Sequence, residues 1–277
     1  PEIVMPRDLG RPPLFQDTAF FVALIMALFA ILFGTRHIDA SEHHEGMVVA
    51  IAFESVIKLA AFLAVGIYVT YGLHDGFQDL FAKGSEVGHI YDLTHTLGSG
   101  GYAQWSTLMV LSMFAIVCLP RQFQVGVVEN VNPDHVRKAA WLFPLYLTVI
   151  NIFVLPIAVG GLLQFPEHNV DADTFVLTVA MANNKEALAL FAYIGGLSAA
   201  TAMLIVATVA LATMVCNDLV VPVLLRMRWF QLRFTGGLTA FLLVVRRSAI
   251  LFVLLLAYTY MRLIGESYAL VTIGLVS

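Results

Sequence analysis

The 277-residue sequence is poor in charge, because only 12% of its residues are Asp, Glu, Lys or Arg, against about 25% in an ordinary soluble domain. Hydrophobic residues make up 60% of the chain, and the mean hydropathy is +0.85. Such a chain cannot cover itself with polar surface, which excludes a water-soluble globule and an intrinsically disordered segment. The net charge of -4 argues against nucleic-acid binding. We therefore expect a chain that folds in the lipid bilayer and has no nucleic-acid partner.

Cysteine is also scarce. Cys118 and Cys216 lie inside or at the edge of apolar runs, so the sequence contains neither a disulfide framework nor a Cys-x-x-Cys metal site. The sequence also lacks a His-Glu-x-x-His zinc motif, because Val48 stands where the second histidine after His44-Glu45 belongs. We expect no metal, no cofactor and no catalytic residue. An intramembrane enzyme that uses His43 and His44 is the alternative.

Long apolar runs are what the sequence has in abundance. A helix needs about 20 apolar residues to cross roughly 30 Å of hydrocarbon, and on that measure we predict six full membrane spans and part of a seventh. The runs are continuous and do not alternate with period two, which favours α-helices over a β-barrel. The sequence thus predicts an all-α integral membrane protein. The predicted spans are Thr18–Gly34, Gly46–Leu73, Tyr102–Pro120, Ala139–Leu163, Ala187–Val215, Ser248–Gly265 and a truncated span from Tyr268.

The loop charges predict the orientation. Alternate connections between the spans hold nine Lys and Arg residues against five on the other side, which places the first set in the cytoplasm. The acidic outer connections, His74–Gly101 and Gln164–Glu186, are expected to be loops with short surface helices. Val220–Leu243 mixes arginines with aromatic residues, and we interpret it as an amphipathic helix at the cytoplasmic headgroup boundary. A soluble linker is the alternative.

Two charges lie inside the second span. Glu54 and Lys58 are four residues apart, so they share a helix face and can pair across one turn. An unpaired Lys near the bilayer centre costs roughly 2.5 to 3.5 kcal/mol, so both residues should face the bundle interior or a water-filled cavity. They line a substrate or proton path in one interpretation and form a structural pair between helices in the other.

The third span ends at Pro120-Arg121-Gln122-Phe123. Proline interrupts a helix and leaves backbone polar groups that are tolerated at membrane depth only where protein or water satisfies them. Transporters bind their substrates at such broken helices. The simpler interpretation is that Pro120 and Arg121 mark the cytoplasmic end of an ordinary span.

The fifth span contains small residues at spacings of four, Gly195 with Ala199 and Ser198 with Ala202, which let another backbone approach closely. The hydroxyls of Ser198 and Thr201 could also hold a small hard cation, since such ions prefer oxygen ligands. Tight helix packing explains the same residues without an ion.

At these residues the sequence resembles the sodium:solute symporter family. The resemblance implies an inverted repeat of five plus five helices, of which this chain covers roughly core helices 4 to 10. The matching segments are Phe33-Gly34-Thr35-Arg36 with Ser41-Glu42-His43-His44-Glu45, Arg121-Gln122-Phe123 with Val136-Arg137-Lys138-Ala139, Ser198-Ala199-Ala200-Thr201-Ala202-Met203-Leu204, and Asp218.

The sequence departs from the family pattern at several of these positions. Ala199 replaces the second serine of the family's sodium-binding pair, and Arg121 replaces the asparagine of the sixth-helix motif. The Asp and Gln of the loop motif are both Glu. Loss of a hydroxyl ligand leaves sodium or protons open as the coupling ion, and Glu54 is the first acid to test for proton coupling. The family's first core helix, which supplies half of its substrate and sodium sites, lies outside this chain.

Residues Leu119 to Val125 and the Glu-His-His-Glu loop are most similar to the transporter-like N-terminal membrane domain of bacterial hybrid sensor histidine kinases. This resemblance implies a multi-pass protein of the bacterial inner membrane and a kinase module C-terminal to this chain. We expect residues 1–277 to be one transporter-like domain, an internal piece of a longer protein, without enzymatic activity of its own.

The resulting hypothesis is binding or transport of a small polar nutrient, such as an amino acid. Arg121, Gln122 and Phe123 line the cytoplasmic half of the path, with Phe123 as an aromatic gate. Ser198 is the remnant of a cation site, and Thr201 is a substitute ligand one turn away. The alternative function is a ligand sensor without transport.

Overall fold

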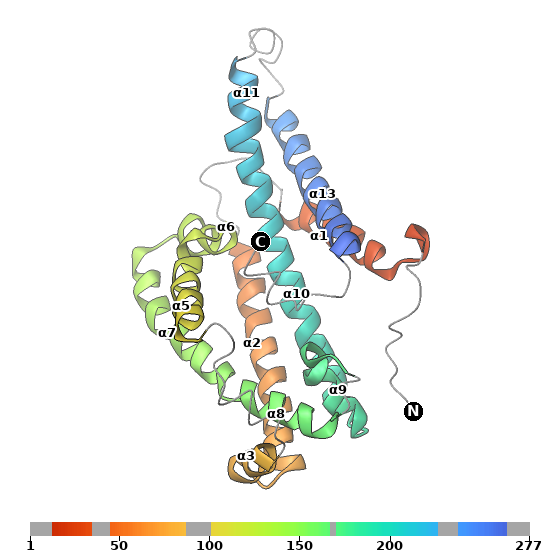
Figure 1. The fold of residues 1–277 in the computed structure, drawn as a ribbon. Coiled ribbons are helices and arrows are strands. Elements are labelled where there is room, and N and C mark those ends of the chain that lie inside the picture. Colours follow the sequence, from red (N-terminus) through yellow and green to blue (C-terminus); the bar gives the residue numbers. More distant parts are fainter. Residues whose placement is uncertain (1–12, 35–44, 87–100, 167–169, 227–237, 265–277) are drawn as a thin grey trace. The chain divides into compact units, whose positions relative to one another are not determined.

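A computed structural model describes residues 13–34, 45–86, 101–166, 170–226 and 238–264. Within these ranges the regular secondary structure is helical and no strand is present, as the sequence predicts. The chain divides into two compact units. Figure 1 shows the helices along the chain.

Unit 1 takes the described residues between 51 and 118 and between 132 and 200. Its elements are α2 (Glu45–Ile67, whose first residues belong to unit 2), the π-helical turn η2 (Tyr68–Leu73), α3 (Phe77–Glu86), α5 (Gly101–Cys118), α7 (Pro133–Asn151), α8 (Val154–Gln164), the short 3-10 helix η4 (Ala172–Thr174), α9 (Phe175–Ala182) and the first half of α10 (Glu186–Met214).

Unit 2 takes the other described residues. Its elements are the 3-10 turn η1 (Leu14–Gln16), α1 (Thr18–Gly34), the short α6 (Pro120–Phe123), the π-helical turn η3 (Gln124–Val128), the second half of α10, the π-helical turn η5 (Val215–Val220), α11 (Val221–Arg226) and α13 (Leu238–Ile264).

Among the described residues, four helical runs are long and apolar enough to cross a membrane, or five if the interrupted pair Ser106–Ala115 and Pro120–Val128 counts as one span. The four runs are Val48–Leu73, Pro133–Gln164, Glu186–Leu224 and Ala240–Leu263. They coincide with four of the six predicted full spans, and the interrupted pair coincides with a fifth. The predicted partial span from Tyr268 lies outside the described residues.

The first predicted span forms a helix with the predicted bounds, α1, but it is 17 residues long. At 1.5 Å per residue it extends about 25 Å, less than the roughly 30 Å of a bilayer core. The count of six full spans therefore stays a prediction.

The cytoplasmic connection predicted at Val220–Leu243 differs from the structure at both ends. Helix α10 continues through η5 and α11, so one apolar run reaches Leu224. Helix α13 begins at Leu238, ten residues before the predicted start, and contains Arg246 and Arg247. Arginine is a good helix former whose long side chain can reach the headgroups, so an arginine pair does not end a helix. Residues 227–237 lie outside the described residues.

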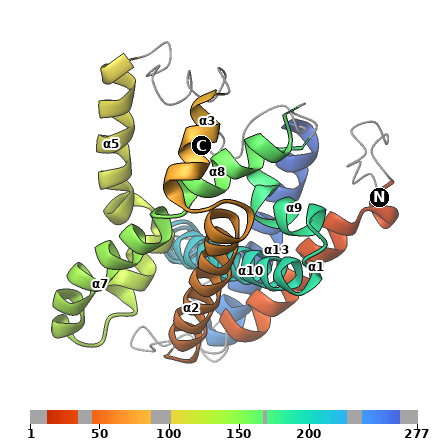
Figure 2. The ribbon, with the colours of Figure 1, turned by 90° about the horizontal axis from the view of Figure 1, so that it is seen from below.

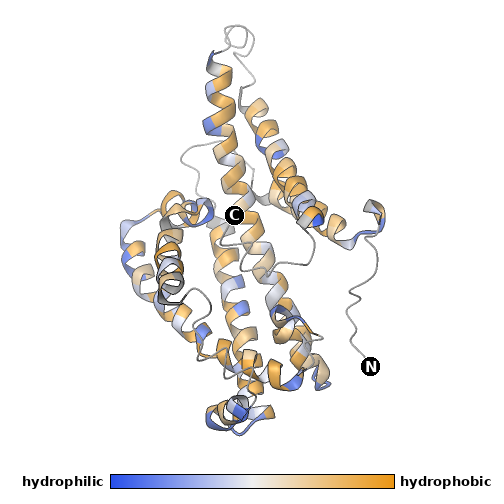
Figure 3. Ribbon diagram, viewed as in Figure 1, coloured by the Kyte–Doolittle hydropathy of each residue, from blue (hydrophilic) through white to orange (hydrophobic). Residues whose placement is uncertain are grey.

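Large apolar side chains are exposed along the span helices. Figure 3 shows hydrophobic positions along the long helices and a concentration of hydrophilic positions on α3. Exposed large hydrophobic residues include Val49, Phe53 and Val56 of α2, Leu190, Ile194 and Leu197 of α10, and Phe252 and Leu256 of α13. Surfaces of this kind are compatible with hydrocarbon and costly in water.

The core of unit 1 lies where the end of α2 meets α8, α9 and the start of α10. Its buried members are Val65, Val69, Ile157, Phe175, Val179 and Ala192. Two glycines allow this packing: a Cβ at Gly66 would collide with the ring of Phe153, and one at Gly161 with the ring of Phe175.

The two outer connections contain short helices, as predicted, but of different kinds. Helix α3 has an exposed charged side and a buried Leu80, and it packs on α8 (Figure 2). Helix α9 buries Phe175, Val179 and Ala180 and belongs to the core. The acidic residues near α9, Asp171 and Asp173, precede it and are exposed. The acidic residues of this connection therefore lie in the turn before α9 and do not indicate a surface position for α9 itself.

A tight turn joins α9 to α10. Asn184 has a φ of 53°, which places it in the left-handed region. The amides of Asn184 and Lys185 donate to the carbonyls of Met181 and Ala180, both at 3.0 Å, which is the Schellman arrangement at a helix C-terminus. This turn fixes where α10 begins.

The core of unit 2 lies where α1, α13 and the second half of α10 meet. Its buried members are Ala27, Ala30, Ala212, Ala249, Ile250 and Leu254. Asp17 joins the start of α1 to the end of α13: its Oδ1 accepts the Ala19 amide at 2.9 Å and its Oδ2 accepts the Tyr258 hydroxyl at 2.7 Å. Arg262 donates from Nη1 to the Tyr258 hydroxyl at 3.2 Å. The hydrogen bond from Tyr258 lowers the pKa of Asp17 below its usual 3.8, although burial partly opposes this effect. The Ala19 amide and Arg262 lower the pKa further.

We predict non-additive stability effects for Asp17→Asn and Tyr258→Phe. Each change should lower the melting temperature by a few degrees, and the double variant should lose less than the sum because both changes weaken the same hydrogen bond between Asp17 and Tyr258. The pKa of Asp17 is lowered in the folded state, so its ionised carboxylate stabilises the fold above pH 3.8. This stabilisation is lost as the pH falls through the lowered pKa. Tyr260→Phe, an exposed neighbour on α13, is the control and should add to Asp17→Asn without coupling.

Candidate functional site

The predicted interruption of the third span is present. Helix α5 ends at Cys118, and Leu119 is extended, with φ of -72° and ψ of 125°. Pro120 then starts α6, where its missing N–H costs nothing. The amides of Gln122 and Phe123 both donate to the Leu119 carbonyl at 3.0 Å. Helical structure thus resumes at once, which fits a broken span and also the end of a span followed by a short helix.

The Arg121-Gln122-Phe123 segment lies in unit 2. Arg121 is half-buried, and its Nε is buried without a hydrogen-bond partner among the described residues. Gln122 and Phe123 are exposed. A half-buried guanidinium with a donor to spare can bind a carboxylate, because its planar fork matches both carboxylate oxygens.

A buried acid that sequence analysis missed lies beside this segment. Glu129 ends η3, is 6% exposed, and accepts the Gln124 side-chain amide at 3.1 Å. The Glu129 amide donates to the Gln124 carbonyl at 2.9 Å, which closes the wide turn. The signal that could have revealed Glu129 is its place directly after the apolar run Val125–Val128, where a charged residue can fold back toward protein.

The charges of the second span lie on α2 in unit 1. Glu54 and Lys58 are both half-buried. The hydroxyl of Tyr146, on α7, donates to the carbonyl of the intervening Ser55 at 3.3 Å. A neutral contact from α7 therefore meets α2 between the two charges.

The small residues of the fifth span do bring another backbone close. A Cβ at Gly195 would lie 2.5 Å from the Ala61 Cβ and 3.8 Å from the Lys58 Cα, so α10 crosses α2 at this glycine. Ser198 and Ala199, one turn further along α10, are half-buried in the same unit. The crossing brings Lys58 to the small-residue segment that carries Ser198. Thr201 is half-buried and begins the part of α10 that belongs to unit 2.

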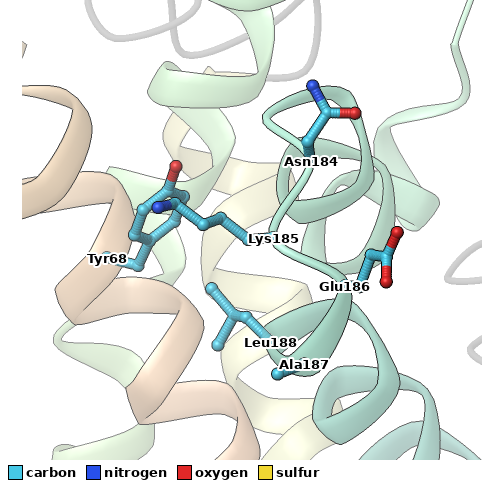
Figure 4. A pocket seen from close by; sticks show the side chains of 6 residues that line it. All are labelled: Tyr68, Asn184, Lys185, Glu186, Ala187 and Leu188. Atoms are coloured by element: carbon cyan, nitrogen blue, oxygen red, sulfur yellow. The ribbon is translucent and has the colours of Figure 1, made fainter.

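A cavity of about 510 Å³ opens at the start of α10 in unit 1. Figure 4 shows Tyr68 and Lys185 pointing toward one another, with the Lys185 Nζ 5.9 Å from the centre of the Tyr68 ring. The predicted site residues are not among those that line this cavity, which are Tyr68, Asn184, Lys185, Glu186, Ala187 and Leu188.

Other motif positions are distributed as follows. Asp218 is exposed on η5, and Arg137 and Lys138 are exposed on α7. Thr35, Arg36 and residues 41–44, with His43 and His44, lie outside the described residues. Within the described residues, no group of three or more His, Cys, Asp or Glu side chains could hold a metal ion.

Comparison with known proteins shows a similarity to a symporter. A 135-residue stretch is 30% identical to "Uncharacterized symporter YhjB" of Bacillus subtilis (strain 168), covering 47% of this chain and 27% of the relative. The chain thus spans about a quarter of the length of the curated relative it matches. No family model and no solved structure matches. The apolar helices and this similarity together describe a multi-pass, transporter-like membrane protein.

Proposed function

We propose that this chain is the membrane domain of a secondary transporter of the sodium:solute symporter type, resident in the bacterial inner membrane. It binds a small polar nutrient such as an amino acid near the bilayer midplane and moves it by alternating access. The observation that carries the proposal is the broken helix at Leu119–Pro120, followed by the half-buried Arg121, in a chain similar to a symporter.

The proposed roles follow from the chemistry of each residue. Arg121 binds the substrate carboxylate, Gln122 offers hydrogen bonds, and the exposed Phe123 is the aromatic gate of the cytoplasmic half-path. Ser198 and Thr201 supply hydroxyl oxygens to a coupling cation.

The coupling ion of this proposal is Na⁺ or H⁺. Ala199 lacks the hydroxyl of the family's second serine, which weakens a sodium site and favours protons. Glu54, half-buried on α2, is then the proton carrier, and Lys58 is the second charge on the path.

The larger protein of this proposal has an inverted repeat of five plus five helices, of which residues 1–277 form core helices 4 to 10. A sensor histidine kinase module follows in the same chain, and the membrane domain reports nutrient to it. In this proposal, binding and transport need no catalytic residue, metal or cofactor from residues 1–277, and the partners of these residues are the lipid bilayer, the solute and that kinase.

Uptake of radiolabelled amino acids, tested one at a time in proteoliposomes made with the intact protein, checks the proposal. We expect saturable accumulation of at least one amino acid above protein-free liposomes. Proton coupling is supported if accumulation persists when choline replaces sodium and rises with an inward proton gradient. If accumulation requires sodium, the inference that Ala199 weakens the sodium site is refuted. If the protein neither binds nor accumulates any of the amino acids, an amino acid substrate is contradicted.

The alternative function is a sensor that binds nutrient without transporting it. Ala199 is compatible with this alternative if no proton coupling replaces the weakened sodium site, because a carrier without a coupling ion cannot concentrate its solute. Saturable binding to the purified protein without accumulation in proteoliposomes would establish the sensor and exclude the transporter.

A further inference from the structure

A tight turn that contains a glycine joins η2 to α3 in unit 1. His74 is extended, and Gly76 follows with a φ of +110°, a backbone conformation that favours glycine. The Gly76 amide donates to the Thr70 carbonyl at 2.9 Å, and the Leu80 amide to the Gly76 carbonyl at 3.1 Å. Residues 74–76 thus connect the end of a membrane span to a short helix outside it.

Three groups converge on one carboxylate oxygen at this turn. The Asp79 Oδ2 accepts the Lys83 ammonium at 2.6 Å and the Asp75 amide at 3.2 Å. The Nδ1 of His74 lies 3.8 Å from the same oxygen, which is too far for a hydrogen bond but close enough for a strong charge interaction. These contacts, the Lys83 hydrogen bond first and the Asp75 amide next, hold the pKa of Asp79 below its usual 3.8.

The surroundings of His74 favour its neutral form. Its side chain is 13% exposed, and its Nδ1 is buried without a hydrogen-bond partner among the described residues. Burial, and then the positive charge of Lys83, lower the pKa of His74 below 6.5, although Asp79 and Asp75 oppose this effect. A proton added to His74 would therefore place a second cation, besides Lys83, near the Asp79 carboxylate.

The described elements that pack against α3 contribute no charged side chain of their own. Helix α8, against which α3 packs, has no ionisable side chain, and η2 contributes only the phenols of Tyr68 and Tyr71. On α3 itself, Glu86 lies in the last turn, so Asp79 and Lys83 are the charges nearest His74. The charge balance of the turn depends on Asp75, Asp79 and Lys83.

Movement of Asp79 would be transmitted directly to the packing of α3. Asp79 lies in the first turn of α3, and the next residue, Leu80, is fully buried beside Val159 of α8. A displacement of the first turn toward His74 would pull Leu80 from that contact.

We propose that residues 74–83 form a proton-operated switch: protonation of His74 at Nδ1 draws Asp79 away from Lys83 and releases α3 from α8. In the neutral state Lys83 holds Asp79 and α3 is docked. In acid the imidazolium and Lys83 compete for one carboxylate, and the first turn of α3 rearranges around Gly76. The switch does not depend on what the membrane domain binds.

Thiol labelling of Leu80→Cys in the intact protein, with Cys118 and Cys216 replaced by serine, tests the switch in lipid nanodiscs. The labelling rate is divided by that of Ser85→Cys, an exposed position on the same helix, which cancels the pH dependence of the thiolate. This ratio should rise at least about threefold between about pH 8 and about pH 5.5. It should stay flat in a His74→Gln background.

Two further measurements sharpen the test. Lys83→Gln removes the competing cation, so the midpoint of the response should move to higher pH. Hydrogen exchange of residues 77–86, corrected for intrinsic rates, gives an independent readout in the protein with its native Leu80 and cysteines. A ratio that does not change with pH, or that rises equally in the His74→Gln protein, would overturn the switch, as would exchange that is identical at both pH values.

Discussion

Alanine at Gly195 is expected to destabilise the protein, whereas alanine at the next position, Gly196, is expected to stabilise it. The new Cβ at Gly195 would lie 2.5 Å from the Ala61 Cβ on α2, so α2 and α10 must separate. Forcing an extra carbon into a packed contact costs typically about 1 to 3 kcal/mol. Thermal unfolding of the two variants in one lipid nanodisc preparation measures the difference.

Gly196 is a matched control because it lies on the same helix and has no atom within 4 Å of the position of a Cβ. Alanine there gains about 0.5 to 1 kcal/mol from the lower flexibility of the unfolded chain, without a packing penalty. Opposite signs for the two variants would establish the α2–α10 crossing. If both alanine variants were equally stabilised, α2 would not pass Gly195 closely. The inference that Lys58 lies near this segment would then also be wrong.

Arg121→Ala should weaken the binding or uptake of the amino acid that the intact protein handles by roughly 100-fold, because a charged hydrogen-bond pair with the carboxylate is lost. The variant should remain folded, since the Arg121 Nε has no hydrogen-bond partner among the described residues. Concentration dependence of uptake, with the melting temperature measured in parallel, gives both quantities.

Arg137→Ala is the control for Arg121→Ala. Arg137 carries the same charge, is exposed on α7 and follows the same broken helix in the sequence. It should leave uptake within about twofold of the unmodified protein, because water and salt screen an exposed charge. Equal losses for the two variants would indicate a general charge effect and remove Arg121 from the substrate path.

The span helices could be predicted from the sequence because a continuous apolar run of sufficient length has few alternatives to a membrane helix. The predicted span Gly46–Leu73 corresponds to α2 with η2, and Ala187 lies one residue inside the start of α10. The broken helix was also accessible, since proline and its flanking polar residues are a local signal. Orientation, the inverted repeat and the number of spans stay predictions.

The remaining features depend on contacts between distant parts of the chain. The small residues near Gly195 predict a close neighbour but cannot identify Ala61 as that neighbour. The hydrogen bond from Tyr258 to Asp17 joins residues 241 positions apart, and neither residue is unusual in its own segment. The start of α13 was misplaced because Arg246 and Arg247 resemble a loop when they are considered without the helix that contains them.

The π-helical turns η2, η3 and η5 give the chain a further property. Each lies directly after a regular helix and accommodates one more residue per turn than the helix before it. The wider turn changes the direction in which the following side chains leave the helix axis, compared with an uninterrupted α-helix. The last side chains after α2, α6 and α10 therefore lie on other faces than the α-helical period alone would give them.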